Sequence, residues 1–354
     1  MVSAVGSANL SPLYWCRRSQ RNKVLTRMKL KSPAYRLFAF SFFAVQVVLC
    51  ATTAARAASR VVAWGDMNYD LVIDSPRRGK EVAIGIAAGS FHSLALQDDG
   101  AVLAWGDDRF GQTHVPGQLQ RIPAVEIAAG NIHNLALMAN GTVVAWGPAA
   151  GQYGDFGQST VPARLKRVVA IAAGAVHSLA LKHDGTVVAW GGNSKGQCDV
   201  PPGLNSVVAI VGGMYHSLVL KEDGTVVAWG ANNSGQATVP DGLNDVVAIA
   251  AGGNHSLALR SDGTVVSWGT YGLVPCDVPA GLQDVVAIAT GDYHSLALLK
   301  DGTLITWGFN TSGQGAVPAG LANVVAIAAR GRHSMVLVDE PQASHSDSHR
   351  RGLK

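Results

Sequence analysis

The chain has 354 residues, of which 48% are hydrophobic and 15% are charged, with four cysteines and a formal net charge of +4. The basic excess comes from residues 1–57, which hold nine Lys or Arg and no acidic residue. Without them, 19 basic residues remain against 24 acidic ones, a net charge of −5. A mildly acidic chain lacks the electrostatic footprint of nucleic-acid binding, so we expect no nucleic-acid partner.

Residues 1–57 have the order of an export signal. The basic residues precede an uncharged apolar run from Leu37 to Ala55, and Ala55-Arg56-Ala57 is an A-x-A cleavage pattern. We therefore predict a signal peptide with its true start at Met28, and an exported protein that is extracellular, periplasmic or in the cell envelope. An uncleaved membrane anchor is the alternative, because the run is near bilayer-spanning length. Lipidation of Cys50 is a third, weaker interpretation.

The rest of the chain repeats one unit seven times. The copy over residues 168–204 reads VVAIAAGAVHSLALKHDGTVVAWGGNSKGQCDVPPGL, and its Trp-Gly pair recurs at intervals of 39 to 44 residues. A histidine recurs in the same way. The tryptophans are Trp64, Trp105, Trp146, Trp190, Trp229, Trp268 and Trp307. The histidines are His92, His133, His177, His216, His255, His294 and His333.

Each unit contains three short apolar runs, VVAIAAG, HSLAL and TVVAWG, bounded by turn residues. Each run predicts a strand, and the Asp-Gly pair between the second and third runs predicts a hairpin. We expect a fourth, short strand around Asp199 and Val200. Units of this length with four antiparallel strands stack radially as blades, so the sequence predicts an all-β, seven-bladed β-propeller over residues 58–339.

The two ends of the repeated region predict how the ring closes. The region begins with Arg60–Gly65, a third strand only, and ends with Val324–Val338, a first and a second strand only. Pairing of the N-terminal strand with the C-terminal hairpin would complete the seventh blade and remove the open sheet edges. The polar residues 340–354 show no strand or helix period, and we expect them to be disordered.

The repeated motifs resemble those of a known family. WG-x-N-x-x-GQ followed by VP, with VVAIAAG-x-x-HSLAL and DG, resembles the regulator of chromosome condensation (RCC1-like) repeat family of seven-bladed propellers. The short, regular units are most similar to its bacterial secreted members, which include a protein inhibitor of β-lactamase. The resemblance implies the fold and not the partner, because one fold carries many functions.

Cys198 and Cys276 are the cysteines outside the N-terminal segment, and they are separated by two units of 39 residues. They occupy the same position in blades two apart. A disulfide requires Cα atoms within about 7 Å, so we expect both thiols to be unpaired.

The constant residues of the repeat predict structure rather than chemistry. Seven histidines at one structural position cannot all be catalytic, and we expect each to form a hydrogen bond between blades. The tryptophan ring fills space between sheets and the following glycine permits the turn. Histidines of successive blades would stand too far apart to share a metal ion. We therefore expect no catalytic residue, metal or cofactor at these positions.

The variable residues gather on one predicted face of the propeller. In each blade the loop between the first two strands and the segment after the third strand emerge together, whereas the opposite face repeats Asp-Gly turns. Aromatic residues, Arg and Asp are enriched where proteins bind one another, although tolerated loop variation is the alternative explanation. The predicted partner-binding face consists of Phe91, Asp108, Arg109, Phe110, Tyr153, Tyr215, Tyr271, Asp292, Tyr293 and Arg332.

Two residues on the predicted innermost strands depart from the repeat. Glu126 stands where the other copies have Ala or Gly, and Arg330 replaces a glycine found in the other six copies. If both side chains point into the central channel, we expect them to form a small polar site. A single carboxylate without a second acid or base is not an active site, so we expect no enzymatic activity.

These observations predict an exported, monomeric scaffold that binds a protein through its variable loop face, with a glycan as the alternative ligand. An enzyme, such as a hydrolase or lyase at the channel mouth, is a second hypothesis. A guanine-nucleotide exchange factor, the function that the family name suggests, is a third. The export signal and the lack of a long insertion both argue against it.

Overall fold

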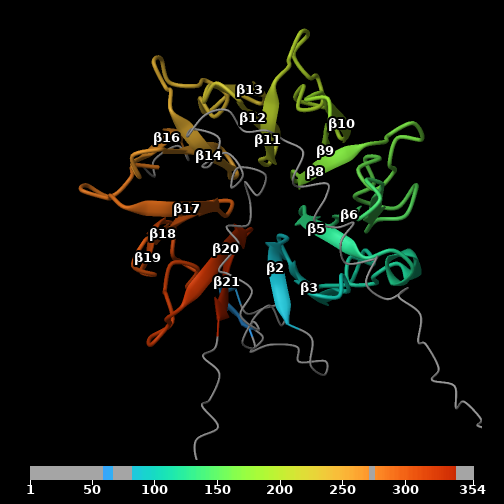
Figure 1. Cartoon of the computed structure of the whole chain (residues 1–354), viewed down its shortest axis with the longest axis horizontal. Helices are drawn as coiled ribbons and strands as arrows, with labels where there is room; N and C mark the ends of the chain where they lie inside the picture. Colours follow the sequence, from blue (N-terminus) through green and yellow to red (C-terminus); the bar gives the residue numbers. More distant parts are fainter. Residues whose placement is uncertain (1–58, 67–81, 271–275, 340–354) are drawn as a thin grey trace, which may run out of the picture. The chain divides into compact units, whose positions relative to one another are not determined.

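In the part of the chain that the structure describes, twenty-one strands form seven antiparallel sheets of three strands, arranged as a ring (Figure 1). This computed structural model describes residues 59–66, 82–270 and 276–339. The predicted signal peptide, the predicted disordered tail and Tyr271 lie outside the described residues. No helix of the described part has the length and hydropathy of a membrane span.

The three runs of each unit become the three strands of a blade, in order from the axis outward. The innermost strands are β2 (Ala83–Ala88), β5 (Ala124–Ala129), β8 (Val168–Ala173), β11 (Val207–Gly212), β14 (Val246–Ala251), β17 (Val285–Thr290) and β20 (Val324–Arg330). The middle strands are β3 (His92–Gln97), β6 (Asn134–Met138), β9 (His177–Lys182), β12 (His216–Lys221), β15 (His255–Arg260), β18 (His294–Leu299) and β21 (His333–Asp339). The outer strands are β4 (Val102–Gly106), β7 (Val143–Trp146), β10 (Val187–Gly191), β13 (Val226–Gly230), β16 (Val265–Gly269), β19 (Leu304–Gly308) and β1 (Ser59–Gly65). One short 3-10 helix, η2 (Gly117–Gln120), follows β4.

The ring closes as the sequence predicts. β1 pairs antiparallel with β21 over seven residues, from Ser59 opposite Asp339 to Gly65 opposite His333. β21 pairs in turn with β20, so the seventh blade combines the two ends of the repeated region. After closure this blade has three strands, as each of the other six does.

The predicted fourth strand is wrong. The backbone N–H of Asp199 donates to the carbonyl of Gly196 at 3.0 Å, and that of Val200 donates to the carbonyl of Cys198 at 3.0 Å. These groups are therefore used inside a turn, and Pro201 and Pro202, which follow, have no N–H to offer a neighbouring strand. Each described blade has three strands, and the segment after the third crosses to the next blade as turns.

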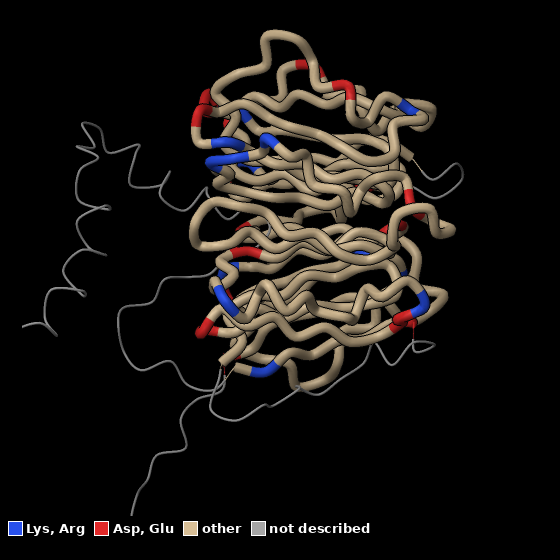
Figure 2. Tube along the Cα trace, turned by 90° about the vertical axis from the view of Figure 1, so that its right-hand side faces the viewer, with Lys and Arg blue, Asp and Glu red and all other residues tan. Residues whose placement is uncertain are grey.

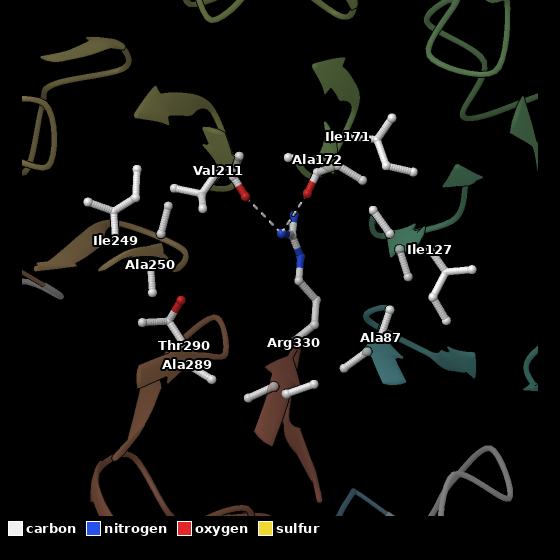
Figure 3. Close-up of a pocket in the computed structure, with 18 of the residues that line it drawn as sticks. Ala87, Ile127, Ile171, Ala172, Val211, Ile249, Ala250, Ala289, Thr290 and Arg330 are labelled. Atoms are coloured by element: carbon white, nitrogen blue, oxygen red, sulfur yellow. Dashed lines mark hydrogen bonds between the residues drawn. The ribbon is translucent and has the colours of Figure 1, made fainter. Parts of the chain in front are cut away.

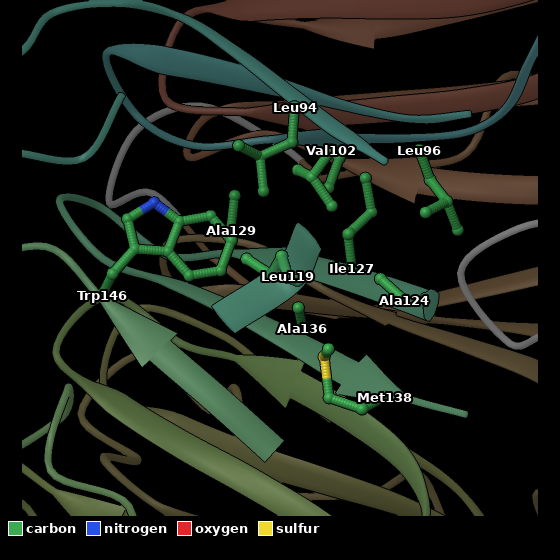
Figure 4. Close-up of a cluster of buried hydrophobic side chains, with 11 residues drawn as sticks. Leu94, Leu96, Val102, Leu119, Ala124, Ile127, Ala129, Ala136, Met138 and Trp146 are labelled. Atoms are coloured by element: carbon green, nitrogen blue, oxygen red, sulfur yellow. The ribbon is translucent and has the colours of Figure 1, made fainter. Parts of the chain in front are cut away.

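The hydrophobic core consists of layers between neighbouring blades. In the layer between the sheets β2–β3–β4 and β5–β6–β7, Leu94 and Leu96 of one sheet pack against Ile127, Met138 and Trp146 of the other (Figure 4). Leu94 is completely buried, and Trp146 is 6% exposed. Dense packing between sheets, repeated from blade to blade, replaces the single core of an ordinary domain.

Both cysteines of the described region are free, which confirms the prediction. Cys276 is buried and Cys198 is partly buried. Burial, together with the neighbouring Asp199 and Asp277, raises the pKa of each thiol to about 11. The thiols are therefore protonated at neutral pH and poor nucleophiles.

Candidate functional site: the loop face

Hydrogen bonds at the ends of the strands define one face of the propeller. The residue after each outer strand donates its N–H to the carbonyl that precedes the middle strand, as Asp107 does to Phe91 at 2.7 Å and Phe309 to Tyr293 at 2.8 Å. The loop between the first two strands and the turn after the third therefore lie together, as predicted. We call this the loop face. Figure 2 views the ring from the side, and most charged residues lie toward its two faces, where the strands end.

The turn after each outer strand is held by side chains of the N-x-x-G-Q motif. In one copy, Asn193 Oδ1 accepts from the N–H of Cys198 at 2.8 Å, and Gln197 Oε1 accepts from the N–H of Lys195 at 2.9 Å. The Gln197 carbonyl accepts from Trp229 Nε1 and Ser217 Oγ of the next blade, both at 2.9 Å. Because constant residues hold the backbone, the residues between them are free to vary.

The seven histidines link the blades into a ring of hydrogen bonds, as predicted. Because Ser217 Oγ donates its proton to the Gln197 carbonyl, it accepts from His177 Nε2 of the preceding blade at 2.9 Å. His333 Nε2 completes the ring by bonding Ser93 Oγ at 3.2 Å. Asn134 replaces the serine in one blade and bonds His92 at 2.6 Å. The other pairs are His133 with Ser178, His216 with Ser256, His255 with Ser295 and His294 with Ser334.

The histidines of this ring are neutral at physiological pH. Burial lowers the pKa of His177, His216, His255 and His333 to about 3, and that of His92 and His294 to about 4. Burial, together with Arg330 and the neighbouring histidines, lowers the pKa of His133 well below its ordinary value. The role of these residues is therefore structural.

Three of the predicted binding residues form one cluster on the loop face. The rings of Phe110 and Tyr153 are 6.4 Å apart, and the Arg109 guanidinium lies 6.0 Å from the centre of the Phe110 ring. The Tyr153 residue is 89% exposed, and Phe156, three residues later on the same loop, is 56% exposed. We call Arg109, Phe110, Tyr153 and Phe156 the aromatic cluster.

The loop that carries Tyr153 and Phe156 is held by its own hydrogen bonds. Asp155 accepts from the N–H groups of Gly151 and Gly157, each at 2.8 Å, and Gln158 Nε2 donates to the carbonyl of Gly154 at 2.6 Å. The same bonds lower the pKa of Asp155. Tyr153 is thus exposed on an ordered loop, which reduces the entropy cost of binding through it.

Two aspartates beside the cluster have positioning roles. Buried Asp107 accepts from Arg109 Nε at 2.9 Å and from Arg109 Nη2 at 3.0 Å, a paired contact that aims the guanidinium along Phe110. Asp108, one of the predicted binding residues, accepts through its carboxylate from the N–H of Thr113 at 3.0 Å and contacts His114 Nε2 at 2.8 Å. It occupies the position of Asn193 in the turn motif.

The remaining predicted residues lie on the loop face outside the cluster. Tyr293 packs edge-on against Phe309 with their ring centres 5.9 Å apart, and both are partly buried. Phe91 and Tyr215 are also partly buried, and Arg332 is exposed. Burial raises the pKa of Asp292.

Phe156 and Phe309 are further aromatic residues of the loop face. Phe156 belongs to the variable loop that carries Tyr153, and it precedes Gly157-Gln158 just as Phe110 precedes Gly111-Gln112. Phe309 directly follows a Trp-Gly pair, and no pattern distinguishes it.

The innermost strands line an axial channel that contains a cavity of about 100 Å³ (Figure 3). Small residues such as Ala87, Ala172 and Ala250 make most of its wall, together with Ile127 and Val211. A cavity of this size excludes drug-sized ligands, whose pockets are about 300 Å³ or larger.

Glu126 and Arg330 both line the channel, but they do not form the predicted polar site. Glu126 occupies the third position of its innermost strand, whereas Arg330 occupies the seventh, so they lie about 13 Å apart along the strand direction. Glu126 Oε2 instead accepts from the N–H of Ile171 at 3.3 Å. Burial raises the pKa of Glu126 to about 8, although the bond from Ile171 opposes this, so the carboxyl is largely protonated at neutral pH.

Within the described residues, no group of three His, Cys, Asp or Glu side chains is arranged to hold a metal ion. Glu126 is the one acidic side chain among the described residues that line the channel.

The fold and its histidine-linked blades define a seven-bladed β-propeller with RCC1-type repeats. A family model described as the RCC1-like domain matches residues 44–343, so the chain belongs to that family, as its motifs predicted. No curated protein sequence matches the chain significantly.

Solved structures share the fold at low sequence identity. Prp20p from Saccharomyces cerevisiae is 20% identical with a TM-score of 0.66, covering 86% of this chain and 95% of its own. Human WBSCR16 is 20% identical with a TM-score of 0.63, covering 80% and 99%. The ectodomain of the Arabidopsis thaliana receptor kinase ACR4 is 20% identical with a TM-score of 0.54, covering 71% and 90%.

Proposed function

We propose that this propeller is an exported scaffold that binds a protein partner through the aromatic cluster of its loop face. The observation that carries the proposal is the exposure of Tyr153 on a hydrogen-bonded loop, next to Phe110 and a positioned Arg109. Tyr and Arg dominate binding hot spots because they combine large rigid contact area with polar ends. The loop is ordered before binding, so little conformational entropy would be lost.

The relatives support a protein partner in general terms. Prp20p has binding properties toward Gsp1p and histones, and yeast RCC1 (Prp20) has been crystallised with Kap60. Those partners belong to those proteins, and at 20% and 23% identity only the fold is shared. For this chain we propose binding rather than catalysis, because Glu126 has no second acid or base beside it among the described channel residues.

The binding proposal is tested with a triple variant, F110A/Y153A/F156A. The partner is first captured from an envelope and secreted extract with the full chain, identified, and then titrated as a purified protein. We expect Kd to rise at least about 100-fold, since hot-spot truncations cost about 2 kcal/mol or more each. The matched control is Phe309→Ala, which removes an aromatic residue of the same face outside the cluster and should leave Kd nearly unchanged.

Equal Kd values for the parent and the triple variant would contradict the cluster as the binding site. Loss of binding in Phe309→Ala alone would move the site to the other side of the loop face. The export part is tested separately by sequencing the N-terminus of the secreted protein, which we expect to begin at Ala58. A retained N-terminal segment in a membrane fraction would favour the anchor instead.

A further inference from the structure

Arg330 occupies a place that the fold reserves for glycine. At the equivalent glycines of the other six blades, an added Cβ would lie 2.0 to 2.3 Å from a ring atom of the histidine in the same blade. In the seventh blade, which carries the arginine, the bond from His333 to Ser93 is the longest of the ring at 3.2 Å. The arginine is therefore accommodated at a cost to local packing.

The side chain crosses the channel and uses only part of its hydrogen-bonding capacity. From β20, Arg330 Nη1 donates to the carbonyls of Ala173 at 3.3 Å and Gly212 at 3.1 Å on the opposite blades (Figure 3). Nε and Nη2 of Arg330 are buried and have no hydrogen-bond partner among the described residues. The residue is only 6% exposed. A buried guanidinium with unused donors is costly unless an acceptor occupies the site.

The charges around this arginine leave room for an anion. The described residues provide no ion pair to Arg330. Burial lowers the pKa of the Arg330 guanidinium, and the charge of Asp292 opposes this lowering in part. Glu126 lies about 13 Å along the strand direction and is largely protonated at neutral pH. The neighbouring histidines are neutral. Arg330 therefore keeps a positive charge that is only partly offset.

The same molecule shows what the free edge of this guanidinium fits. In Arg109, Nε and Nη2 are the atoms that hold the two carboxylate oxygens of Asp107, at 2.9 and 3.0 Å. These two N–H groups are parallel and match the spacing of a carboxylate, which explains the strength of such paired bonds. In Arg330 the same two groups are unused.

We propose that the loop-face end of the axial channel is a binding site for a single carboxylate group, and that the buried Nε and Nη2 edge of Arg330 turns toward the cavity to hold it. The cavity of about 100 Å³ exceeds the roughly 10 to 15 Å³ that a cavity needs in order to hold one water, and it suits a group of a few atoms. The Thr290 hydroxyl, where most other copies have Ala, adds a polar group to the wall. Two sources share this chemistry: a free small carboxylate, or an acidic side chain of a protein that covers the loop face.

The test titrates the full chain with ¹³C-formate and with acetate, and follows ligand line broadening by NMR. We expect saturable binding to the parent and a Kd about tenfold higher or more in Arg330→Gly, which restores the residue of the other six blades. Glu126→Ala is the matched control, because it alters the same channel outside the site, and it should bind as the parent does. Arg330→Lys keeps the charge without the paired donors and should bind more weakly than the parent.

Absence of saturable formate and acetate binding to the parent, or equal binding to Arg330→Gly, would overturn the proposal. If Arg330→Gly does not fold, Arg330→Lys decides, and unchanged binding to it would contradict a paired site. Doubly blocked aspartic acid, with acetyl and N-methylamide ends, distinguishes the sources. Binding of acetate alone assigns the site to free carboxylates, and binding of both shows that a side chain fits. These probes need no protein partner, so the result is independent of the proposed loop-face function.

Discussion

The two faces of this propeller are made by the same strands and differ in what holds their turns. On the face opposite the loop face, Asp184, Asp223 and Asp262 each accept from the hydroxyl of the threonine two residues later, at 2.6 to 2.7 Å. These turns are nearly identical from blade to blade. On the loop face, the turns are held by Asn and Gln, and the residues between them vary. Variation is therefore tolerated where the backbone is fixed by other side chains.

The largest expected effect is a loss of stability at acidic pH, where the histidine ring and the turns of the opposite face respond in different pH ranges. The buried histidines have a folded pKa near 3 to 4 against about 6.5 unfolded, so the unfolded state binds more protons below pH 6.5. Stability therefore falls as the pH drops through this window, by about 1.4 kcal/mol per pH unit for each neutral histidine. We expect the chain to unfold cooperatively well above pH 4. Tryptophan fluorescence and circular dichroism during an acid titration measure this transition.

The turns of the opposite face act in a lower window. Hydrogen bonds from Thr225 and Lys221 lower the pKa of Asp223 to about 2, so its contribution to stability is present above about pH 4 and is lost only below it.

The double variant H177Q/H216Q tests the histidine ring. Between pH 6.5 and 4, the number of protons that the chain takes up on unfolding should be smaller by about two than in the parent. A parent chain that keeps its stability down to pH 4 would show that the histidine ring is not the acid-sensitive element.

A smaller effect tests the anchoring of the loop-face turns. Trp229 Nε1 bonds the Gln197 carbonyl, whereas Trp307 Nε1 is buried and has no partner among the described residues, because the sixth unit replaces the N-x-x-G-Q turn. Trp229→Phe should cost about 1 kcal/mol more than Trp307→Phe in urea unfolding, the value of the lost hydrogen bond. Equal costs would mean that the Gln carbonyl does not anchor the next blade.

The smallest expected effect belongs to the opposite face. Thr225→Val removes the hydroxyl that bonds Asp223, which is exposed to solvent. We expect the unfolding midpoint to change by less than about 2 °C in differential scanning calorimetry, and partner binding to remain as in the parent. A large loss of binding in this variant would show that the partner binds the opposite face and would contradict the loop face as its site.

The fold was predictable because the sequence repeats it seven times. Residues such as His177 and Trp190 return at fixed intervals, and the incomplete units at the two ends indicate the closure. The fourth strand at Asp199 and Val200 was wrong because local turn hydrogen bonds, which depend on backbone geometry, compete with strand pairing.

The candidate site was predictable only in part, because it depends on side-chain direction. The sequence placed Arg109, Phe110 and Tyr153 on one face, but neither the contact between the rings nor the pairing of Arg109 with Asp107 follows from residue spacing. Glu126 and Arg330 were each recognisable as departures from the repeat. Their separation became clear only from their heights along the channel.

The pairing of β1 with β21 also has a consequence for how the chain folds. The first strand of the ring has no sheet to join until the last hairpin has been made, so the seventh blade is the contact of greatest sequence separation. Loop-closure entropy must be overcome there before any pairing energy is gained. During synthesis the first six blades can form in order, and the last step is the pairing of β1 with β21, which closes the ring. A circular permutant that joins the two ends and opens the chain between other blades would shift this slow step without changing the final ring.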